Sequence, residues 1–280
     1  MERLRGRRFK SALTAGIEWF SRFRRRVDEI NVFPVADGDT GKNMHHAFQA
    51  ALREIRGVRA DSASEVAWAA ARGALLGGRG CSGMILSGFF TGFAEAVGNR
   101  RTLTGEELAR ALAVGCLRAR ERIEQPVEGT ILTVGEQAAR EAAHQAQVSP
   151  LIFRVLYGAW CGAREALEKT RDQLNVLKSN NVVDAGGQGL VYFYEGLVRF
   201  AQGRRRGDAA QAFPAPPPRP AAAAVTTPHR FCTEFLLEPT SGAGAVASLR
   251  EELAGPEGGD GLAEAADQLR RTAEGLRGEA

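Results

Sequence analysis

The chain has 280 residues, a net charge of +4 and 44% hydrophobic residues, so it can bury one large core or two small ones. Its four cysteines form no CxxC pair and follow no recognisable targeting segment, which disfavours a zinc cluster or a disulfide framework and makes a cytoplasmic location the expectation. The longest apolar run, 151–163, is too short to span a bilayer. With only 7% aromatic residues and abundant Ala and Gly, packed helices are favoured over a β-sandwich.

Basic residues concentrate at the start of the chain. Residues 1–26 hold nine Lys and Arg against Glu2 and Glu18. Such a stretch can indicate an anionic partner, either nucleic acid or a membrane surface. A solvated, arginine-rich helix face also accounts for it and is the favoured interpretation, so nucleic acid is not expected as a partner.

Helix start signals follow in chain order. Residues 62–65 form a capping box, and apolar residues at helical spacing continue from there to a stop at Gly77 and Gly78. Residues 104–107 form a second capping box inside a Leu103–Leu108 hydrophobic staple. Two helices are therefore predicted after these boxes.

Further signals extend the helical pattern toward residue 203. The helix after the second capping box should end near Pro126, and Thr130 should begin the next one. Residues 149–150 read as a cap followed by proline at the first helical position, and Asp184 should cap a last helix. No clear strand alternation occurs in this part, so residues 1–203 are predicted to be all-α.

The composition changes at residue 204. Residues 204–228 are rich in Pro, Ala and Arg and cannot bury much apolar surface, so they are predicted to be a linker. Beyond it, residues 231–238 alternate apolar and polar side chains like a strand, and residues 246–279 contain a possible helix. One strand and one helix do not make a stable domain, so residues 229–280 read as an incomplete α/β tail.

The segment 31–44 carries the strongest chemical signal. Asp37 and Asp39 flank Gly38, whose freedom lets the backbone turn sharply, so that both carboxylates can converge on one ion. Carboxylate oxygens suit Mg²⁺, which commonly takes phosphate oxygens as its other ligands. A helix should begin directly afterwards and point free N–H groups at an anion. An ordinary loop with two capping aspartates would also produce a bare Asp-Gly-Asp.

Three weaker segments share a Gly-rich or capped helix start. Residues 75–86 place four glycines around Arg79 and Ser82 and could form a phosphate-binding turn, although a plain helix–helix corner fits equally well. They match neither a Walker A loop nor a dinucleotide fingerprint. Residues 128–133 and 181–189 are each consistent with a simple capped helix start.

Histidines give little additional information. His45 and His46 lie one turn into the helix after the Asp loop, where a catalytic or phosphate-binding role competes with the favoured interpretation of solvent-facing or locally bonded side chains. His144 lies among Ala and Gln and is predicted to be at the surface.

Taken together, four segments resemble one family. INVFPVADGDTGKNM, LLGGRGCSGMIL, EGTILTV and NVVDAGGQGLVYFYEG occur in the order and spacing of the DhaL-type domain of FakA, the ATP-binding subunit of bacterial fatty acid kinase. The same domain type forms the nucleotide-binding part of dihydroxyacetone kinases. The resemblance covers about residues 9–203, and 231–238 resemble the start of the kinase's middle domain.

This resemblance implies a fold and a site. The expected fold is an antiparallel helical barrel with the nucleotide at its mouth and Mg²⁺ held by Asp37 and Asp39. Dihydroxyacetone kinases have a third Asp where this chain has Val32, and the adjacent Asn31 is the expected substitute, as in fatty acid kinases. Cys81 replaces an Asn usual in the family. The residues implied to bind the nucleotide are Thr40, Gly41, Asn43, Met44, Gly78, Gly80, Cys81, Ser82, Gly83, Gly129, Thr130, Asp184 and Gly186.

The resemblance also implies an activity and partners. With Mg²⁺ and ATP as cofactors, the domain would phosphorylate the carboxylate of a fatty acid held by a DegV-like carrier protein, FakB, to give an acyl phosphate; a homodimer is possible. The family's His-x-His pair is absent, because His229 precedes the predicted strand and does not match it. A dihydroxyacetone kinase subunit and a truncated ATP-binding module without transferase activity therefore remain alternatives.

Overall fold

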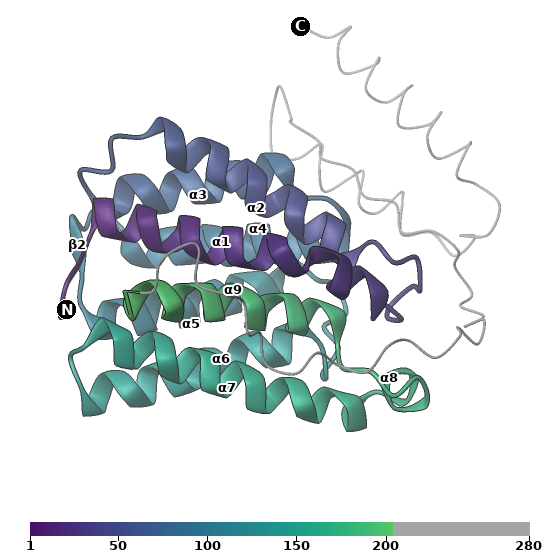
Figure 1. Ribbon diagram of the computed structural model, residues 1–280. Helices are drawn as coiled ribbons and strands as arrows, with labels where there is room; N and C mark the ends of the chain where they lie inside the picture. Colours follow the sequence, from purple (N-terminus) through teal and green to yellow (C-terminus); the bar gives the residue numbers. More distant parts are fainter. Residues whose placement is uncertain (204–280) are drawn as a thin grey trace, which may run out of the picture. The chain divides into compact units, whose positions relative to one another are not determined.

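The computed structural model describes residues 1–203; the predicted linker at 204–228 and the predicted tail at 229–280 lie outside the described residues. Within residues 1–203 the secondary structure is almost entirely helical (Figure 1). The elements are β1 (Leu4–Arg5), α1 (Gly6–Glu29), α2 (Thr40–Gly57), α3 (Ala63–Gly77), α4 (Gly80–Val97), β2 (Thr102–Leu103), α5 (Gly105–Glu121), α6 (Ile131–Val148), α7 (Ile152–Gln173), α8 (Asn175–Ser179) and α9 (Ala185–Ala201).

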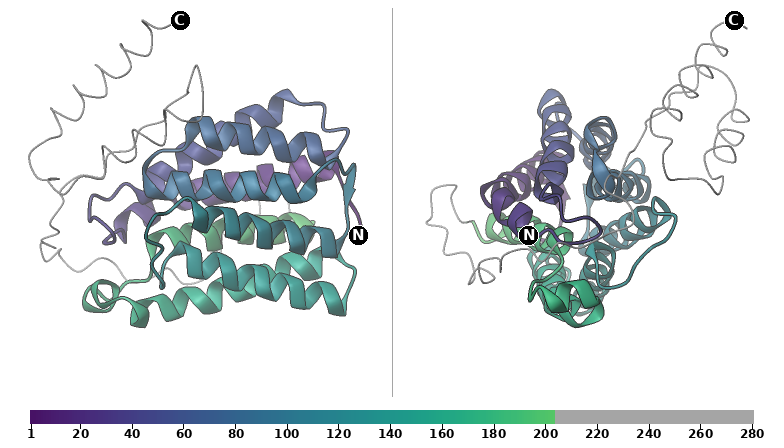
Figure 2. Two further views of the ribbon diagram at one scale, coloured as in Figure 1. Left: turned by 180° about the vertical axis from the view of Figure 1, so that it is seen from behind. Right: turned by 90° about the vertical axis from the view of Figure 1, so that its right-hand side faces the viewer.

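The long helices form a closed antiparallel ring. Each of α1 to α7 packs against the next in the chain, and α9 packs against both α7 and α1 (Figure 1 and Figure 2). Because α1 contacts α9, the first and last helices close the barrel. The predicted all-α antiparallel barrel is therefore confirmed. None of the helices within residues 1–203 combines the length and apolar character needed to cross a membrane.

Aromatic rings from four helices fill the middle of the barrel. Phe48 of α2 lies 4.9 Å from Phe20 of α1 and 5.0 Å from Phe193 of α9 between ring centroids, and 6.1 Å from Phe90 of α4. All four side chains are at most 2% exposed. Burying one such aromatic side chain contributes about 1.5–3 kcal/mol relative to leaving it in water. The cluster therefore holds α1, α2, α4 and α9 together.

The helix caps explain most of the boundaries. Thr104 and Glu107 form a reciprocal capping box at the start of α5, and Thr130 and Asp184 cap α6 and α9. Ser62 also caps α3 by accepting a hydrogen bond from the backbone N–H of Glu65, but the Glu65 carboxylate accepts from the N–H groups of Arg59 and Asp61, so only half of the predicted capping box forms. These are the starts that the sequence predicted.

Three details differ from the expectations. The helix expected to reach Pro126 ends at Glu121. The start predicted at 149–150 is wrong, because Ser149 terminates α6 by donating its backbone N–H to the carbonyl of Gln145, and α7 begins only at Ile152. The antiparallel pair β1–β2 was not expected, since two-residue strands are too short to show alternation.

The alternating direction of the helices separates two ends of the barrel. The N-termini of α2, α4, α6 and α9 lie at one end, next to α8. The N-terminus of the chain, β1 and β2 lie at the other end, as the N label and β2 in Figure 1 show. The candidate site described next belongs to the first end.

Candidate functional site

A cavity of about 290 Å³ opens at the end where the four helix N-termini meet. It is lined by the loop before α2 and by the first turns of α2, α4, α6 and α9, together with the loop between α5 and α6. Segments that are up to about 150 residues apart in sequence therefore share one cavity. The lining residues are Asn31, Phe33, Pro34, Val35, Asp37, Asp39, Thr40, Asn43, Gly80, Cys81, Ser82, Ile85, Ile123, Gln125, Val127, Thr130, Ile131, Leu132, Asp184 and Gly186.

The first turn of α2 is capped from a distance by Asp28. This residue lies in the last turn of α1, and its Oδ1 accepts a hydrogen bond of 2.9 Å from the backbone N–H of Lys42. Asp39 occupies the local N-cap position but makes no side-chain cap bond. Because Asp28 performs the capping, the carboxylate of Asp39 is available to the cavity. Sequence reasoning missed Asp28, since nothing local connects it to a helix start fourteen residues away.

Asp37 and Asp39 form an acidic pair at the mouth of the cavity. The backbone N–H of Asp39 donates to Oδ1 of Asp37 at 3.3 Å, and Nδ2 of Asn43 holds Oδ1 of Asp39 at 2.9 Å. Partial desolvation, followed by the charge of Asp39, raises the pKa of Asp37 above its ordinary value. Two carboxylates that repel one another in this way are stabilised by a divalent cation between them.

The Asn31 side chain makes three hydrogen bonds inside the loop. Its Oδ1 accepts hydrogen bonds from the backbone N–H of Thr40, at 2.9 Å, and from the Thr40 hydroxyl. Its Nδ2 donates to the carbonyl of Val35 at 2.7 Å, and the residue is 1% exposed. An amide oxygen with both lone pairs occupied fits the positioning of the loop better than ligation of a metal.

We therefore predict that Asn31→Ala lowers the free energy of unfolding by about 2–4 kcal/mol even without Mg²⁺ and ATP, because a buried set of three hydrogen bonds is lost. Urea denaturation of the metal-free protein measures this. The matched control is Asn180→Ala, which removes a single amide hydrogen bond, to Val176, and should cost less. Wild-type stability combined with weakened metal affinity would instead make Asn31 a ligand.

The Gly-rich turn before α4 packs onto the start of α2. Gly80 has a φ of 60°, and a side chain there would collide with Nδ2 of Asn43. The hydroxyl of Ser82 donates to the carbonyl of Thr40 at 3.4 Å. Glycine is needed at position 80 both for its backbone conformation and for this contact. The turn thus brings the free N–H groups of α4 beside the carboxylate pair.

Asp184 joins the starts of α6 and α9. Its Oδ2 accepts a hydrogen bond of 2.7 Å from the backbone N–H of Gly187, and the N–H of Ile131 also lies near the carboxylate. Burial raises the pKa of Asp184 to about 6, although these two N–H groups oppose the shift. Thr130 caps α6 beside it, donating its hydroxyl to the carbonyl of Val127 at 2.8 Å.

The cavity has a polar side that favours anions. Four helix N-termini reach its lining, and each carries roughly half a positive elementary charge, so together they contribute about two. The two carboxylates of Asp37 and Asp39 add a negative charge of similar size in the same cavity. A polyphosphate would therefore be attracted by the helix ends and repelled by the carboxylates unless a cation lay between them.

The cavity also has apolar wall residues, and sequence reasoning missed their grouping. Six of them lie within the motifs described above, where they look like ordinary apolar residues, and Ile123 and Val127 lie in the loop between α5 and α6. The closure of the ring brings them together. A wall of this kind suits a flat heterocycle. Its members are Phe33, Pro34, Val35, Ile85, Ile123, Val127, Ile131 and Leu132.

Comparison with known proteins assigns this arrangement to a family. The family model described as DAK2 domain matches residues 34–199, which is more than half of the chain. The chain belongs to the DAK2 domain family. The matched span begins with the loop that carries the acidic pair and ends in α9, so it includes nearly all of the cavity lining.

Relatives of this DAK2 domain are longer proteins. Protein YloV of Bacillus subtilis is 38% identical over 200 residues, which cover 71% of this chain and 36% of YloV. An uncharacterized protein of Staphylococcus haemolyticus is 34% identical over 204 residues, covering 73% of this chain and 37% of that protein. The chain thus spans little more than a third of the length of these relatives.

A solved structure supports the fold of the DAK2 domain. The dihydroxyacetone kinase of C. freundii in its native form matches with a TM-score of 0.51 and 18% sequence identity, over 70% of this chain and 35% of that chain. At this identity the likeness concerns the fold alone.

Five residues predicted to bind the nucleotide are not part of the cavity lining of the DAK2 domain. Met44 is buried in the core. Gly78 and Gly83 lie where the start of α4 packs against α2, Gly41 packs against α1, and Gly129 precedes the cap of α6 with a φ of 81°. These residues shape the walls of the cavity, and their direct contact with a nucleotide stays a prediction.

The histidines lie away from the cavity. Nδ1 of His45 is 3.3 Å from the hydroxyl of Ser21, and burial lowers the pKa of His45 and of His46. Neither residue lines the cavity. His144 is exposed and lies 3.8 Å from Glu141, so its predicted surface position is confirmed.

The donor set of the DAK2 domain fits Mg²⁺ better than a metal that needs a full protein cage. Within the described part of the chain, no group of three or more His, Cys, Asp or Glu side chains is arranged to hold a metal. Two carboxylates at the mouth of a cavity are enough for Mg²⁺, because this ion commonly completes its coordination with water and phosphate oxygens. Asp37 and Asp39 are the residues that would hold it.

Proposed function

We propose that this DAK2 domain is an ATP-dependent phosphotransferase domain that binds Mg-ATP in the cavity lined by the four helix N-termini. One observation carries the proposal: an acidic pair, four helix starts and an apolar wall converge on a single cavity of about 290 Å³. A nucleotide has the complementary parts, namely a polyphosphate that needs a cation and N–H donors and a base that needs an apolar slot.

Each group in the cavity then has a distinct role. The backbone N–H groups at Gly80 to Ser82 and at Thr130 would bind phosphate oxygens. Asp37 and Asp39 would hold Mg²⁺, which when bound neutralises phosphate charge during transfer. Asn31 and Asn43 keep the acidic pair in place through the contacts described above. Phosphoryl transfer depends mainly on positioning and charge neutralisation, so this set meets its main demands.

For the acceptor we propose the carboxylate of a fatty acid held by a separate carrier protein. The γ-phosphoryl group would pass from ATP to a carboxylate oxygen, giving an acyl phosphate and ADP. Support comes from the resemblance to fatty acid kinase and from Val32, which stands beside Asn31 at the position where dihydroxyacetone kinases have aspartate. The acidic pair lies at the cavity mouth, with Asp37 exposed, where an acceptor bound to another protein can approach.

A second function is favoured by the structural neighbour. The dihydroxyacetone kinase of C. freundii shares the fold, so a small triose acceptor is the alternative to a fatty acid. The two acceptors differ in the nucleophile, which is a hydroxyl in the triose and a carboxylate in the fatty acid. A carboxylate product is an acyl phosphate that reacts with hydroxylamine, whereas a phosphate ester does not.

The test combines binding with turnover. ATP is titrated into the 280-residue chain by calorimetry with and without Mg²⁺, and ADP formation is then followed with a fatty-acid-loaded carrier and separately with dihydroxyacetone. We expect Mg²⁺-dependent binding, and hydroxylamine-reactive product only with the carrier. Binding without turnover on either acceptor would reduce the proposal to an ATP-binding module. A folded chain that binds no ATP would overturn it.

A further inference from the structure

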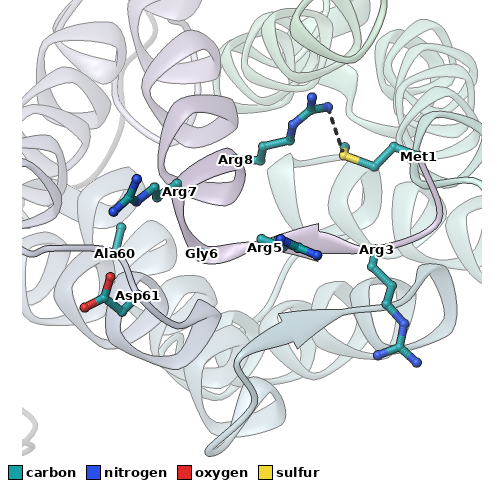
Figure 3. A pocket seen from close by; sticks show the side chains of 8 residues that line it. All are labelled: Met1, Arg3, Arg5, Gly6, Arg7, Arg8, Ala60 and Asp61. Carbon is teal, nitrogen blue, oxygen red and sulfur yellow. Dashed lines mark hydrogen bonds between the residues drawn. The ribbon is translucent and has the colours of Figure 1, made fainter.

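The barrel end opposite the cavity carries a cluster of arginines. Arg3, Arg5, Arg7 and Arg8 surround a hollow of about 660 Å³, which also includes Met1, Gly6, Ala60 and Asp61 (Figure 3). We call these four arginines the distal arginine face. All four are exposed, and among the described residues none of them forms an ion pair with a carboxylate.

The start of α1 adds to the positive charge of this end, which Asp61 offsets only in part. Arg5 is the N-cap residue and makes no side-chain cap bond, and the first turn of α1 contains no acidic residue. The N-terminus of a helix is the positive end of its dipole, where acidic residues are normally stabilising and arginines are not. Four guanidinium groups around such an end create a site of repulsion that an anionic partner would relieve.

The arginines point in different directions rather than toward one point. In Figure 3, Arg7 extends toward Ala60 and Asp61, while Arg8 donates from Nη1 to the Met1 sulfur at 3.2 Å and Arg3 is directed away from both. A single phosphate or a small anion is bound by donors that converge. The divergent arrangement suits an extended surface with many negative charges.

Exposed apolar residues border the distal arginine face. Met1 is 41% exposed, and its carbonyl accepts a hydrogen bond of 3.0 Å from the N–H of Ile152 at the start of α7. Next to that helix start lie Leu151 and Val148, which are 37% and 69% exposed. Exposed aliphatic side chains beside unpaired arginines are typical of surfaces that bind an anionic bilayer. They are poorly suited to a nucleic-acid backbone, which offers phosphates but no hydrocarbon.

We propose that the distal arginine face, with Met1, Val148 and Leu151, docks on a membrane surface rich in anionic lipids. The helices between the two ends are 15–24 residues long, which corresponds to roughly 22–36 Å. A domain docked in this way keeps its cavity away from the bilayer and open to the aqueous phase. The inference does not depend on ATP binding, because it concerns the other end of the barrel.

The test is sedimentation of the 280-residue chain with vesicles of neutral phosphatidylcholine alone or with about 30 mol% phosphatidylserine. We expect binding only to the anionic vesicles, and weaker binding as NaCl is raised. Each arginine near such a surface contributes roughly a fivefold increase in partition coefficient. We therefore expect the partition coefficient to fall at least about 50-fold in the combined variant Arg3→Gln, Arg5→Gln, Arg7→Gln, Arg8→Gln.

A matched variant removes the same charge elsewhere. Arg25→Gln, Arg140→Gln, Lys169→Gln and Lys178→Gln neutralise four exposed basic residues away from the distal arginine face and should change binding less than about threefold. A third variant, Val148→Ser with Leu151→Ser, keeps every charge, and its binding to anionic vesicles should weaken several-fold. This variant decides the question if the arginine variant does not fold.

Three results would overturn the proposal. The first is no binding to anionic vesicles at about 0.1 M salt. The second is an equal loss in the arginine variant and its matched control, which would mean that only net charge matters. The third is unchanged binding in the Val148→Ser, Leu151→Ser variant together with tight binding to duplex DNA, which would assign the face to a nucleic acid.

Discussion

Replacing Asp39 by Asn is expected to weaken Mg²⁺-dependent ATP binding by at least about 100-fold, because an acidic pair that has lost one charge no longer holds the cation against the phosphates. Asp37→Asn should act in the same direction. Each substitution preserves the local contact, because an amide oxygen at position 37 can still accept from the N–H of residue 39, and one at position 39 can still accept from Nδ2 of Asn43. Calorimetric titration of ATP with and without Mg²⁺ measures the change.

The same substitutions should leave the metal-free protein at least as stable as before. The charge of Asp39 contributes to the raised pKa of Asp37, so removing one charge relieves repulsion. Thermal unfolding should therefore show an unchanged or higher Tm without ligand, and a lost upward shift with Mg-ATP. Asp61→Asn, an exposed aspartate at the opposite end of the barrel, is the control. Wild-type ATP affinity in both site variants would place the cation elsewhere.

Local chemistry in the sequence was enough to locate the polar half of the site. Asp37, Gly80, Thr130 and Asp184 are all marked by glycines or caps next to a helix start, and such features depend on only a few neighbouring residues. The antiparallel alternation of helices then brings every second helix start to one end. The sequence therefore marks residues of the polar part of the cavity lining without any knowledge of which helices are neighbours.

The apolar half of the site could not be found in this way. Ile85 and Ile123 look like ordinary hydrophobic residues in or beside helices, and they face a cavity only because α4 and α5 pack next to one another. The contact between α9 and α1 that closes the barrel is equally hard to predict from the sequence. A Cβ on Gly196 would lie 2.7 Å from the Cα of Gly16, so α9 and α1 approach very closely at two glycines with no local signature.

Asp28 shows how tertiary structure divides the roles of the aspartates near the start of α2. The sequence offered Asp39 either as a helix cap or as a metal ligand. In the fold, Asp28 caps α2 through Lys42, and its carboxylate pKa is raised by burial even though that hydrogen bond opposes the shift. A residue from the preceding helix thus takes the capping role and leaves Asp39 for the cavity, a division that only tertiary structure reveals.

Asp184 is expected to make the protein less stable as the pH rises from about 4 to 6. The pKa of this buried carboxyl is raised from 3.8 to about 6, so the folded state holds a proton that the unfolded state has already released. An acid with a raised pKa in the folded state stabilises that state only while it is protonated. A shift of about two pH units corresponds to about 3 kcal/mol at pH 7 relative to pH 4.

Asp184→Asn isolates this contribution, because the amide does not titrate and its oxygen can still accept from the N–H of Gly187. Urea denaturation at a series of pH values measures the free energy of unfolding. Relative to the wild type, that of the variant should rise by up to about 3 kcal/mol between pH 4 and pH 7. Asp172→Asn, at an exposed site on α7, should show no such trend. If the difference in free energy of unfolding between variant and wild type were the same at every pH, Asp184 would remain charged throughout this range.

The position of Asp184 links this titration to the ligand. Its carboxylate lies in the wall of the same cavity as the acidic pair, beside the starts of α6 and α9. Phosphates arriving there would disfavour its charged form, so ATP binding near pH 6 to 7 should be accompanied by proton uptake. Calorimetry in two buffers of different ionisation enthalpy measures that uptake. Its disappearance in Asp184→Asn would assign the proton to this residue, whereas its persistence would assign the proton to another group.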